Sequence, residues 1–200
     1  MNSQFQFWQN AFASDAWYYG ADAGTVARRA VRYATTRGKA LDCGCGEGQD
    51  LAFLAASGFG STGLDFTASG VEKTRRILAS RGLQGEALQA DLSTFDFAPL
   101  HGRFSLVLCV NALQFLGAAA PRVLGEIAAC VAPGGVLGLS VFAPGGSNTA
   151  RDDIWLCSIE ALVETLAPRF TMHETCALSQ WHNGVPQPFA TLVARRKDDQ

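Results

Sequence analysis

Short, continuous apolar segments alternate with helical patterns along most of the chain, and this alternation limits the fold more than any other feature. Such segments are expected for strands buried on both faces of a parallel sheet. Alternation with helices predicts βαβ units with right-handed crossovers, and therefore an α/β fold with a doubly wound sheet. The predicted strands span residues 40–43, 61–65, 85–90, 104–110 and 135–142.

Helical patterns with recognisable start and stop signals fill the gaps between these strands. The first has an apolar stripe followed by Gly58, which would end the helix. The second begins at Ser69, with Glu72 three residues later, which is the spacing of a capping box. The third is entered through Pro121 and closed by the Pro-Gly-Gly sequence at residues 133–135.

The C-terminal part of the chain follows a different pattern. A helix is predicted from about residue 158 to 166, and two strand-like segments follow at residues 170–178 and 189–195. Because no helical pattern separates these two segments, they should pair as an antiparallel hairpin at the edge of the sheet.

The first 22 residues are rich in aromatic side chains. We expect them either to pack on the domain surface or to act as a lid over a ligand site. The length of 200 residues suits one domain. We therefore predict a single domain over residues 1–200, with this N-terminal segment at 1–22 and the Rossmann-like core at 23–200.

The decisive local motif joins the first predicted strand to its helix. The strand ends in Asp42, and glycines follow at alternating positions, which allows positive φ angles and close approach of a bound group: Gly44, Gly46 and Gly48. The dinucleotide pattern GxGxxG would need a glycine where the chain has Gln49. Because Asp42 and Glu47 bracket the turn, it favours a cationic, amino-bearing ligand over a pyrophosphate.

Polar side chains also end the next three predicted strands. Asp65 ends the second strand, where a carboxylate can accept hydrogen bonds from both ribose hydroxyls. Asp91 ends the third strand, beside the place of an adenine, and Asn111 ends the fourth. One such acid is more often a turn or helix cap, but together these residues predict a shared ligand crevice.

The sequence resembles the class I S-adenosylmethionine-dependent methyltransferases. The motifs are LDCGCGEG, GLDFTASGVEKTR, QADLSTF, FSLVLCVNALQFL and LxxxVAPGGVLGLSVF, and they cover about residues 20–145. The resemblance implies a seven-stranded sheet with a reversed last strand and S-adenosyl-L-methionine as the cofactor. It implies that the three glycines contact the methionyl part, Asp65 the ribose, Asp91 the adenine amino group and Asn111 the methionine end. The remaining predicted cofactor contacts are Asp42, Phe66, Leu92 and Tyr19.

The whole chain is also similar to the small bacterial tellurite-resistance methyltransferases. The shared features are an early W…F…Y…G sequence, the compact size and the ending PFATLVARRK. In that family a histidine and arginines in the C-terminal hairpin are associated with catalysis. Here the segment LSQWHNGVPQPFAT carries His182 but no arginine.

The resemblance implies transfer of a methyl group to a small-molecule acceptor. A thiol or a chalcogen oxyanion would need no general base, whereas a hydroxyl or amine would benefit from one. We expect His182 to lie in a loop at the rim of the crevice, and it is the candidate catalytic residue. His101 is expected in an exposed turn and His173 in a strand. The loop at residues 143–149, with Arg151, Asp152 and Trp155, is expected to help wall the acceptor pocket.

Other functions stay open at this point. A nicotinamide oxidoreductase is disfavoured by the glycine spacing, and a nucleic-acid or protein methyltransferase by the lack of a basic stripe. A cofactor-binding regulatory or assembly protein without activity is the alternative from another class.

Charge and composition limit the classes of partner that can be expected. The net charge of −2 argues against a nucleic-acid partner. No stretch resembles a signal peptide or a membrane span, so neither a membrane partner nor a leader is expected. The six cysteines include one CxC pair, which does not make a four-ligand metal site. We interpret the cysteines as reduced and the protein as cytoplasmic, with no bound metal and an undetermined oligomeric state.

Overall fold

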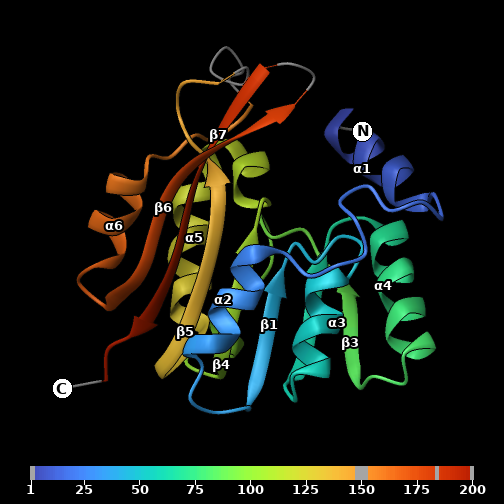
Figure 1. Ribbon diagram of the computed structural model, residues 1–200, viewed down its shortest axis with the longest axis horizontal. Coiled ribbons are helices and arrows are strands. Elements are labelled where there is room, and N and C mark those ends of the chain that lie inside the picture. Colours follow the sequence, from blue (N-terminus) through green and yellow to red (C-terminus); the bar gives the residue numbers. More distant parts are fainter. Residues whose placement is uncertain (1–2, 147–152, 183–184, 199–200) are drawn as a thin grey trace.

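The computed structural model describes residues 3–146, 153–182 and 185–198. These residues form a seven-stranded sheet in the order β3-β2-β1-β4-β5-β7-β6, as expected for the predicted α/β fold (Figure 1). In chain order the strands are β1 (Lys39–Cys43), β2 (Gly60–Asp65), β3 (Gly85–Gln89), β4 (Phe104–Val110), β5 (Val131–Phe142), β6 (Phe170–His182) and β7 (Val185–Arg196).

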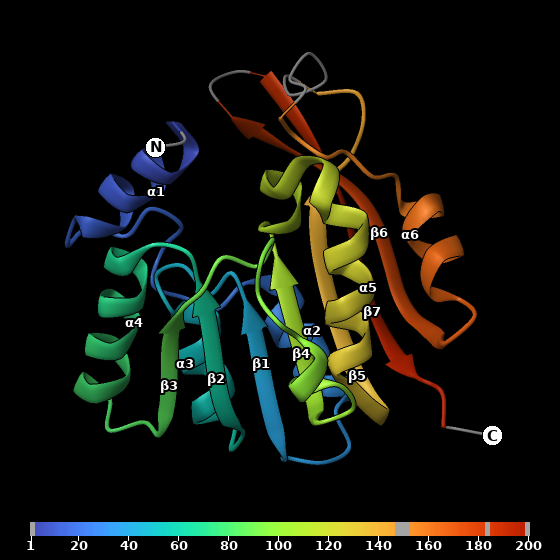
Figure 2. The same ribbon diagram turned by 180° about the vertical axis from the view of Figure 1, so that it is seen from behind.

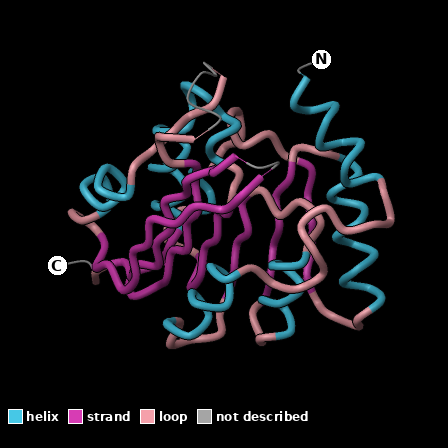
Figure 3. The backbone as a smooth tube through the Cα atoms, turned by 45° about the horizontal axis from the view of Figure 1, so that its top comes forward, coloured by secondary structure: helices cyan, strands magenta, loops and turns pink. Residues whose placement is uncertain are grey.

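Helices cover both faces of the sheet, which gives the three-layer architecture seen in Figures 2 and 3. One face carries α2, α3 and α4, the other face carries α5, and α6 lies beside the C-terminal hairpin. The helices are α1 (Ser3–Ala13), α2 (Thr25–Tyr33), α3 (Gln49–Ala56), α4 (Ala68–Ser80), α5 (Ala120–Cys130) and α6 (Ile159–Leu166), with short 3₁₀ helices η1 (Ala98–Leu100) and η2 (Leu113–Ala119).

Strand directions confirm the predicted mixture of parallel and antiparallel pairs. β1 pairs in parallel with β2 and β4, and β5 pairs in parallel with β4. β7 runs antiparallel to both β5 and β6, so the C-terminal hairpin forms one edge of the sheet. The hairpin is longer than expected, because pairing continues to His182 and Val185. His182 therefore ends a strand, and the prediction that it lies in a loop is wrong.

Some predicted boundaries and environments also need correction. α4 is capped by Thr67, whose side chain accepts from the Gly70 amide, and not by Ser69, whose hydroxyl donates to the Gln9 carbonyl. The fifth strand begins at Val131 because this residue pairs with Phe104 before the register shifts. β3 is an edge strand and buries little more than Ala87, so it is not covered on both faces.

The core has a main cluster on each face of the sheet and a smaller third cluster between α3 and α4, around Leu51 and Leu78. Side chains of β1, β4 and β5 alternate between the two main clusters, so that Leu41 and Val107 pack with Val123 of α5, whereas Leu106 packs with Ala27 of α2. Burial of each large aliphatic side chain contributes about 1.5–3 kcal/mol. Because both faces are covered, a ligand can approach only the edges of the sheet, and the carboxyl ends of β1–β4 lie at the edge nearest α1 (Figure 1).

Candidate active site at the carboxyl edge of the sheet

The glycine-rich turn leaves β1 at this edge and can be formed only by glycine at its key positions. Gly44, Gly46 and Gly48 have φ angles of 85°, 51° and 87°, a region that L-residues with a Cβ adopt at a cost. Gly44 is also limited by packing, because a Cβ there would lie 2.4 Å from the Cβ of Ala112. The predicted turn with positive φ angles is therefore confirmed.

Asp65 joins the end of β2 to this turn. Its carboxylate accepts from the amide of Gly46 at 2.9 Å, and from the amide and hydroxyl of Thr67 at 2.9 and 2.6 Å. Burial raises the pKa of Asp65, and the hydrogen bonds from Thr67 and Gly46 oppose that rise. Asp65 thus fixes the local backbone, and the lone pairs that remain on a carboxylate can accept further hydrogen bonds.

A second buried acid lies beneath the turn. Asp42 is 3% exposed, and burial raises its pKa well above the usual value, with the charges of Asp50 and Asp65 raising it further. Asp50 accepts from the Gly24 amide at 2.6 Å, which partly offsets the rise that burial causes in its own pKa. Burial thus disfavours the ionised form of all three carboxyls, and a cationic ligand at this edge would favour it.

The third strand end is more open to solvent. Asp91 has an exposed side chain whose Oδ1 accepts from the amide and hydroxyl of Ser93 at 2.8 and 2.7 Å. Leu92 is buried. Phe66, which follows β2, is partly buried, and its ring meets Phe5 of α1 edge-on at 5.7 Å. Asp91 therefore caps its own turn, as single acids at strand ends commonly do.

The end of β4 carries an unusual backbone conformation. Asn111 has a φ of 56°, which is uncommon for a residue other than glycine and often marks a functional site. Its side-chain oxygen accepts from the hydroxyl of Ser140 at 2.8 Å. Three residues later Gln114 is fully buried, and neither polar atom of its side chain has a hydrogen-bond partner among the described residues. Gln114 lies within the motif FSLVLCVNALQFL, and nothing in the sequence distinguishes it as a functional residue.

Helix α1 packs on α4 and also contacts residues that follow β2 and β4. Phe5 meets Phe66 after β2, and Trp8 meets Phe115 after β4 at 5.4 Å between ring centroids. Between them, the ring of Phe12 lies 3.3 Å from where a Cβ on Gly46 would be. The aromatic N-terminal segment thus folds over the glycine turn.

Tyr19 belongs to the aromatic cluster that α1 forms with the segment after it. Its ring stacks on Trp8 with 5.8 Å between centroids and remains 50% exposed. Tyr18 packs edge-on against both rings. Tyr19 is therefore half-exposed beside Trp8, and its backbone amide donates to Glu47 of the glycine turn.

A buried ion pair lies between this segment and the turn. The Nζ atom of Lys73 lies 2.7 Å from Oε1 of Glu47, and both residues are almost completely buried. The Glu47 carboxylate also accepts from the amides of Tyr18 and Tyr19 at 3.0 Å. The positive partner of Glu47 is thus a side chain of the protein itself. Nothing in the sequence singles out Lys73, which is one of several charged residues in a helical pattern.

The histidines differ in their position relative to the crevice. His101 lies before β4 and pairs with Glu126 at 2.8 Å, and His173 lies near the start of β6 and stacks on Tyr33. Both are at the amino-terminal edge of the sheet, opposite the crevice. The backbone of His182 ends β6 at the carboxyl edge. Its side chain, like Arg151 and Asp152, lies outside what the structure describes.

The cysteines are free and five of the six are buried. Burial raises the pKa of the Cys43 and Cys45 thiols well above the usual value and that of Cys130 to about 12. These thiols therefore stay protonated at neutral pH and are poor nucleophiles. Within residues 3–146, 153–182 and 185–198, no cluster of His, Cys, Asp and Glu suits a metal ion.

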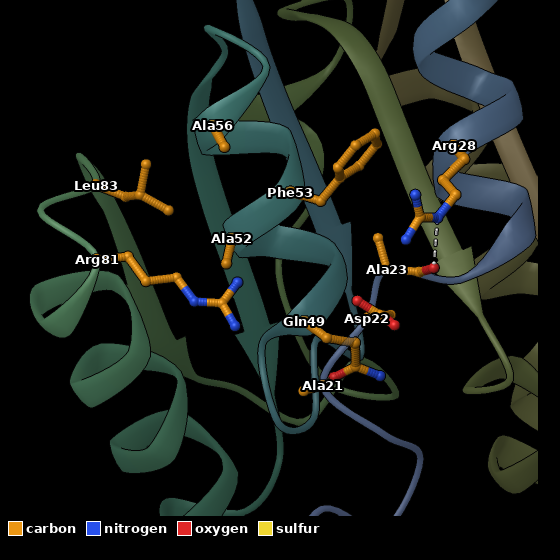
Figure 4. A pocket seen from close by; sticks show the side chains of 10 residues that line it. All are labelled: Ala21, Asp22, Ala23, Arg28, Gln49, Ala52, Phe53, Ala56, Arg81 and Leu83. Carbon is orange, nitrogen blue, oxygen red and sulfur yellow. Dashed lines mark hydrogen bonds between the residues drawn. The ribbon is translucent and has the colours of Figure 1, made fainter.

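A surface hollow of about 440 Å³ lies elsewhere, on the outer side of α3 (Figure 4). Arg28 on one side donates to the Ala23 carbonyl at 2.9 Å and covers the Phe53 ring, and Arg81 lies on the other side. The strand-end residues Asp42, Asp65 and Asn111 do not line this hollow. It is therefore separate from the candidate site.

The residues at the carboxyl edge suit the expected cofactor. S-Adenosylmethionine carries an ammonium and a sulfonium charge and a ribose diol. The Asp42, Asp50 and Asp65 carboxyls, of which the last two raise the pKa of Asp42, suit the positive charges, and the glycine turn allows close approach to the backbone.

Comparison with known proteins agrees with this arrangement. Residues 40–135 match the family model described as a methyltransferase domain. The ribosomal RNA small subunit methyltransferase C of Alcanivorax borkumensis is 35% identical over 106 residues, which are 51% of this chain and 31% of that protein. The chain spans less than a third of the length of the first curated relatives it matches.

Solved structures share the fold at low sequence identity. The N-methyltransferase NodS from Bradyrhizobium japonicum, in complex with S-adenosylhomocysteine, has a TM-score of 0.76 at 16% identity and covers 98% of this chain and 99% of its own. TehB from Haemophilus influenzae has a TM-score of 0.73 at 14% identity over 97% and 67% of the two chains. The 1,6-didemethyltoxoflavin N1-methyltransferase of Burkholderia thailandensis, with its acceptor and S-adenosylhomocysteine bound, has a TM-score of 0.66 at 21% identity over 87% and 79%.

No helix among the described residues is long and apolar enough to cross a bilayer. The matched residues 40–135 contain the glycine turn, Asp65, Asp91 and Asn111. Residues 40–135 therefore match a methyltransferase domain, and the chain has the fold of the solved methyltransferase structures.

Proposed function

We propose that this chain is a methyltransferase that transfers a methyl group from S-adenosylmethionine to a small-molecule acceptor. The observation that carries the proposal is the position of α1 over the glycine turn and the buried acids at the strand ends. α1 contacts residues that follow β2 and β4, through Phe5 with Phe66 and Trp8 with Phe115. A small molecule fits beneath such a cover, whereas a polynucleotide or a folded protein would have to displace it.

In this proposal the cofactor lies along the ends of β1 to β4. Asp65 accepts from the ribose hydroxyls, Asp91 and Leu92 lie beside the adenine, and Phe66 packs against its ring. The amino acid end of the cofactor lies over Gly44, Gly46 and Gly48, close to Asp42 and Asn111, and Tyr19 covers it from the rim. The support is the convergence of these residues at one edge of the sheet.

The bound cofactor would supply an electrophilic methyl group on a sulfonium. The protein would contribute position and exclusion of water, which can account for much of the rate of a methyl transfer. Phe115, Phe142 and Phe189 form a chain of edge-to-face rings beside the end of β4. Gln114 next to them has a buried amide without a partner, which an acceptor could satisfy.

The choice of acceptor follows from the scarcity of bases near this edge. Two of the three histidines lie at the opposite edge, so His182 is the remaining candidate for a general base. A thiolate or a chalcogen oxyanion is already anionic at neutral pH or nearly so, and needs no base. We therefore propose such soft nucleophiles as the first acceptors to test. The Burkholderia enzyme named above binds a small heteroaromatic acceptor, so this class belongs in the same test.

The acids of the crevice disfavour a nucleic-acid acceptor. A phosphate backbone binds through Lys and Arg, whereas Asp42, Asp50 and Asp65 meet at the glycine turn. The ribosomal RNA methyltransferase relatives nevertheless make RNA the acceptor class against which the proposal must be tested.

The test is to incubate the protein with methyl-labelled S-adenosylmethionine and separate acceptors. The panel contains small thiols, tellurite, selenite, phenols and heteroaromatic amines, and a parallel reaction contains ribosomal small subunits and bare ribosomal RNA. Label on a small molecule supports the proposal. Label on RNA alone contradicts it. Tight cofactor binding without transfer to any acceptor would favour the alternative of a cofactor-binding regulatory or assembly protein.

A further inference from the structure

The segment between α1 and α2 is attached to the glycine turn by two buried charges. This linking segment, residues 14–19, passes over Glu47 and Lys73, whose exposed fractions are 1% and 4%. Lys73 Nζ donates to the carbonyls of Ser14 and Ala16 at 2.8 and 2.7 Å and to Glu47 at 2.7 Å. All three donors of the ammonium group are therefore used.

Glu47 completes the attachment from the other side. Its two carboxylate oxygens accept from the amide of Tyr18, and Oε2 accepts also from the amide of Tyr19. The pair thus binds backbone groups of the linking segment at four residues, two through carbonyls and two through amides. The ring of Trp17 adds a cation–π contact with Lys73 at 5.1 Å.

The location of Glu47 connects this attachment to the ligand crevice. Glu47 stands between Gly46 and Gly48 within the glycine turn, and Lys73 lies on α4 behind it. The linking segment leads back to α1, whose Phe12 contacts the turn at Gly46. A shift of the ion pair would therefore move both the turn and the cover above it.

We propose that Glu47 and Lys73 are positioning residues for the cofactor, which hold the linking segment and α1 closed over the glycine turn and so slow the release of bound cofactor. The pair does not touch the reacting atoms in this account. The proposal rests on the cofactor site alone and is independent of the identity of the acceptor.

The chain supplies a matched control for the test. Arg76 lies one turn further along α4 and pairs with Asp15 of the same linking segment at 3.6 Å, but both side chains are largely exposed. An exposed pair of this kind contributes little to stability. Arg76→Met therefore removes a charge from the same helix and the same segment without disturbing the buried attachment.

The experiment measures the dissociation rate of S-adenosylhomocysteine and, with any acceptor that the panel above identifies, the KM for S-adenosylmethionine and kcat. The variants are Lys73→Met, the double variant Glu47→Gln/Lys73→Met and Arg76→Met. Lys73→Met leaves an unpaired buried carboxylate and should lower Tm, and the double variant should recover part of it. We expect both to increase the dissociation rate and KM about tenfold or more while kcat changes by less than about twofold. Arg76→Met should behave as wild type.

The double variant separates positioning from simple folding stability. If its dissociation rate returns to the wild-type value together with Tm, or if Arg76→Met has the same effect as Lys73→Met, the proposal is wrong. Failure of the wild-type protein to bind S-adenosylhomocysteine at all would be a different result, because it would contradict the cofactor site itself.

Discussion

The two halves of the crevice are built in different ways. Around the ends of β1 to β3, backbone amides and carboxylates hold one another, as in the bond from the Gly46 amide to Asp65. Around the end of β4 the contacts join distant segments, such as Trp8 with Phe115, Phe142 with Phe189, and the Trp155 amide with the Gln114 carbonyl. The first half is held mainly by polar contacts, whereas the second is aromatic and depends on long-range packing. This difference suggests that one half binds an invariant ligand and the other determines the acceptor.

The strongest way to disrupt the first half is at Gly44. In Gly44→Ala the new Cβ would lie 2.4 Å from that of Ala112 at a φ of 85°, and the turn must move. We expect affinity for S-adenosylhomocysteine to fall by about 100-fold or more, measured by equilibrium dialysis. Gly82→Ala is the control, because Gly82 also has positive φ but nothing lies within 4 Å of its Cβ position. Equal losses in the two variants would mean that general backbone strain, and not the turn, explains the effect.

A smaller effect is expected at Asp65, which links the glycine turn to β2. Asp65→Asn cannot accept from the Gly46 amide and both Thr67 donors as the carboxylate does. We expect a loss of cofactor affinity of about 10- to 100-fold and a decrease in stability of about 1–3 kcal/mol, measured by calorimetry and denaturant unfolding. Asp96→Asn replaces an exposed acid that only accepts from the Ala98 amide. The affinity of the Asp96→Asn variant for the cofactor should not change. An unaltered cofactor affinity in Asp65→Asn would contradict the proposal that Asp65 binds the ribose.

The second half can be tested without disturbing the first. Gln114→Leu replaces a buried amide that lacks partners with an apolar side chain of similar size. The free energy of unfolding should rise by about 1 kcal/mol. Once an acceptor is known, its kcat/KM should fall about tenfold, and the affinity for S-adenosylhomocysteine should stay constant. A change in cofactor affinity with no change in kcat/KM for the acceptor would reverse our assignment of the two halves.

The smallest expected effect is a pH dependence of cofactor binding. Burial and neighbouring carboxylates raise the pKa of Asp42, so in the free protein it keeps its proton to a higher pH than an exposed aspartate. A bound cation favours the ionised form, so binding should release protons and affinity should rise with pH through this range. Calorimetry in buffers of different ionisation enthalpy measures the protons released, and Asp42→Asn should release fewer.

The raised pKa of Asp42 also affects the stability of the free protein. A carboxyl whose pKa is higher in the folded state than about 4 in the unfolded state lowers stability as the pH rises between those values. The free protein should therefore lose this contribution on going from mildly acidic to neutral pH, and the cofactor should restore it. A stabilisation by cofactor that is independent of pH would argue against Asp42 as the group that faces the cation.

Local motifs made one half of the site predictable from sequence. The glycine turn, Asp65 and Asn111 each follow a strand directly, so strand order alone brings them together. Phe12, Lys73 and Gln114 were missed because their roles arise from contacts across many residues, such as the bond from Lys73 to Ser14 over 59 positions. The cap of α4 was misplaced by two residues because Thr67 and Ser69 are both good capping residues, and only tertiary contact of Ser69 with Gln9 decides between them.

The length of the C-terminal hairpin was also hard to predict. Pro186, Gln187 and Pro188 suggest a loop, yet all three pair with β6 at the end of the edge hairpin, where proline is tolerated. His182 was therefore placed in a loop although its backbone belongs to a strand. Its role as a general base stays a prediction, to be tested by comparing kcat of His182→Ala with a thiol and with a phenol acceptor. Only the phenol should lose activity, because a thiolate needs no base.

The central claim is that the crevice at the carboxyl edge is built for an adenosyl sulfonium and not for a dinucleotide. It is tested most directly by titrating purified protein with S-adenosylhomocysteine, S-adenosylmethionine and NADH in a calorimeter. We predict saturable binding of the first two at one site and no binding of NADH. Binding of NADH without either adenosyl compound would contradict the claim.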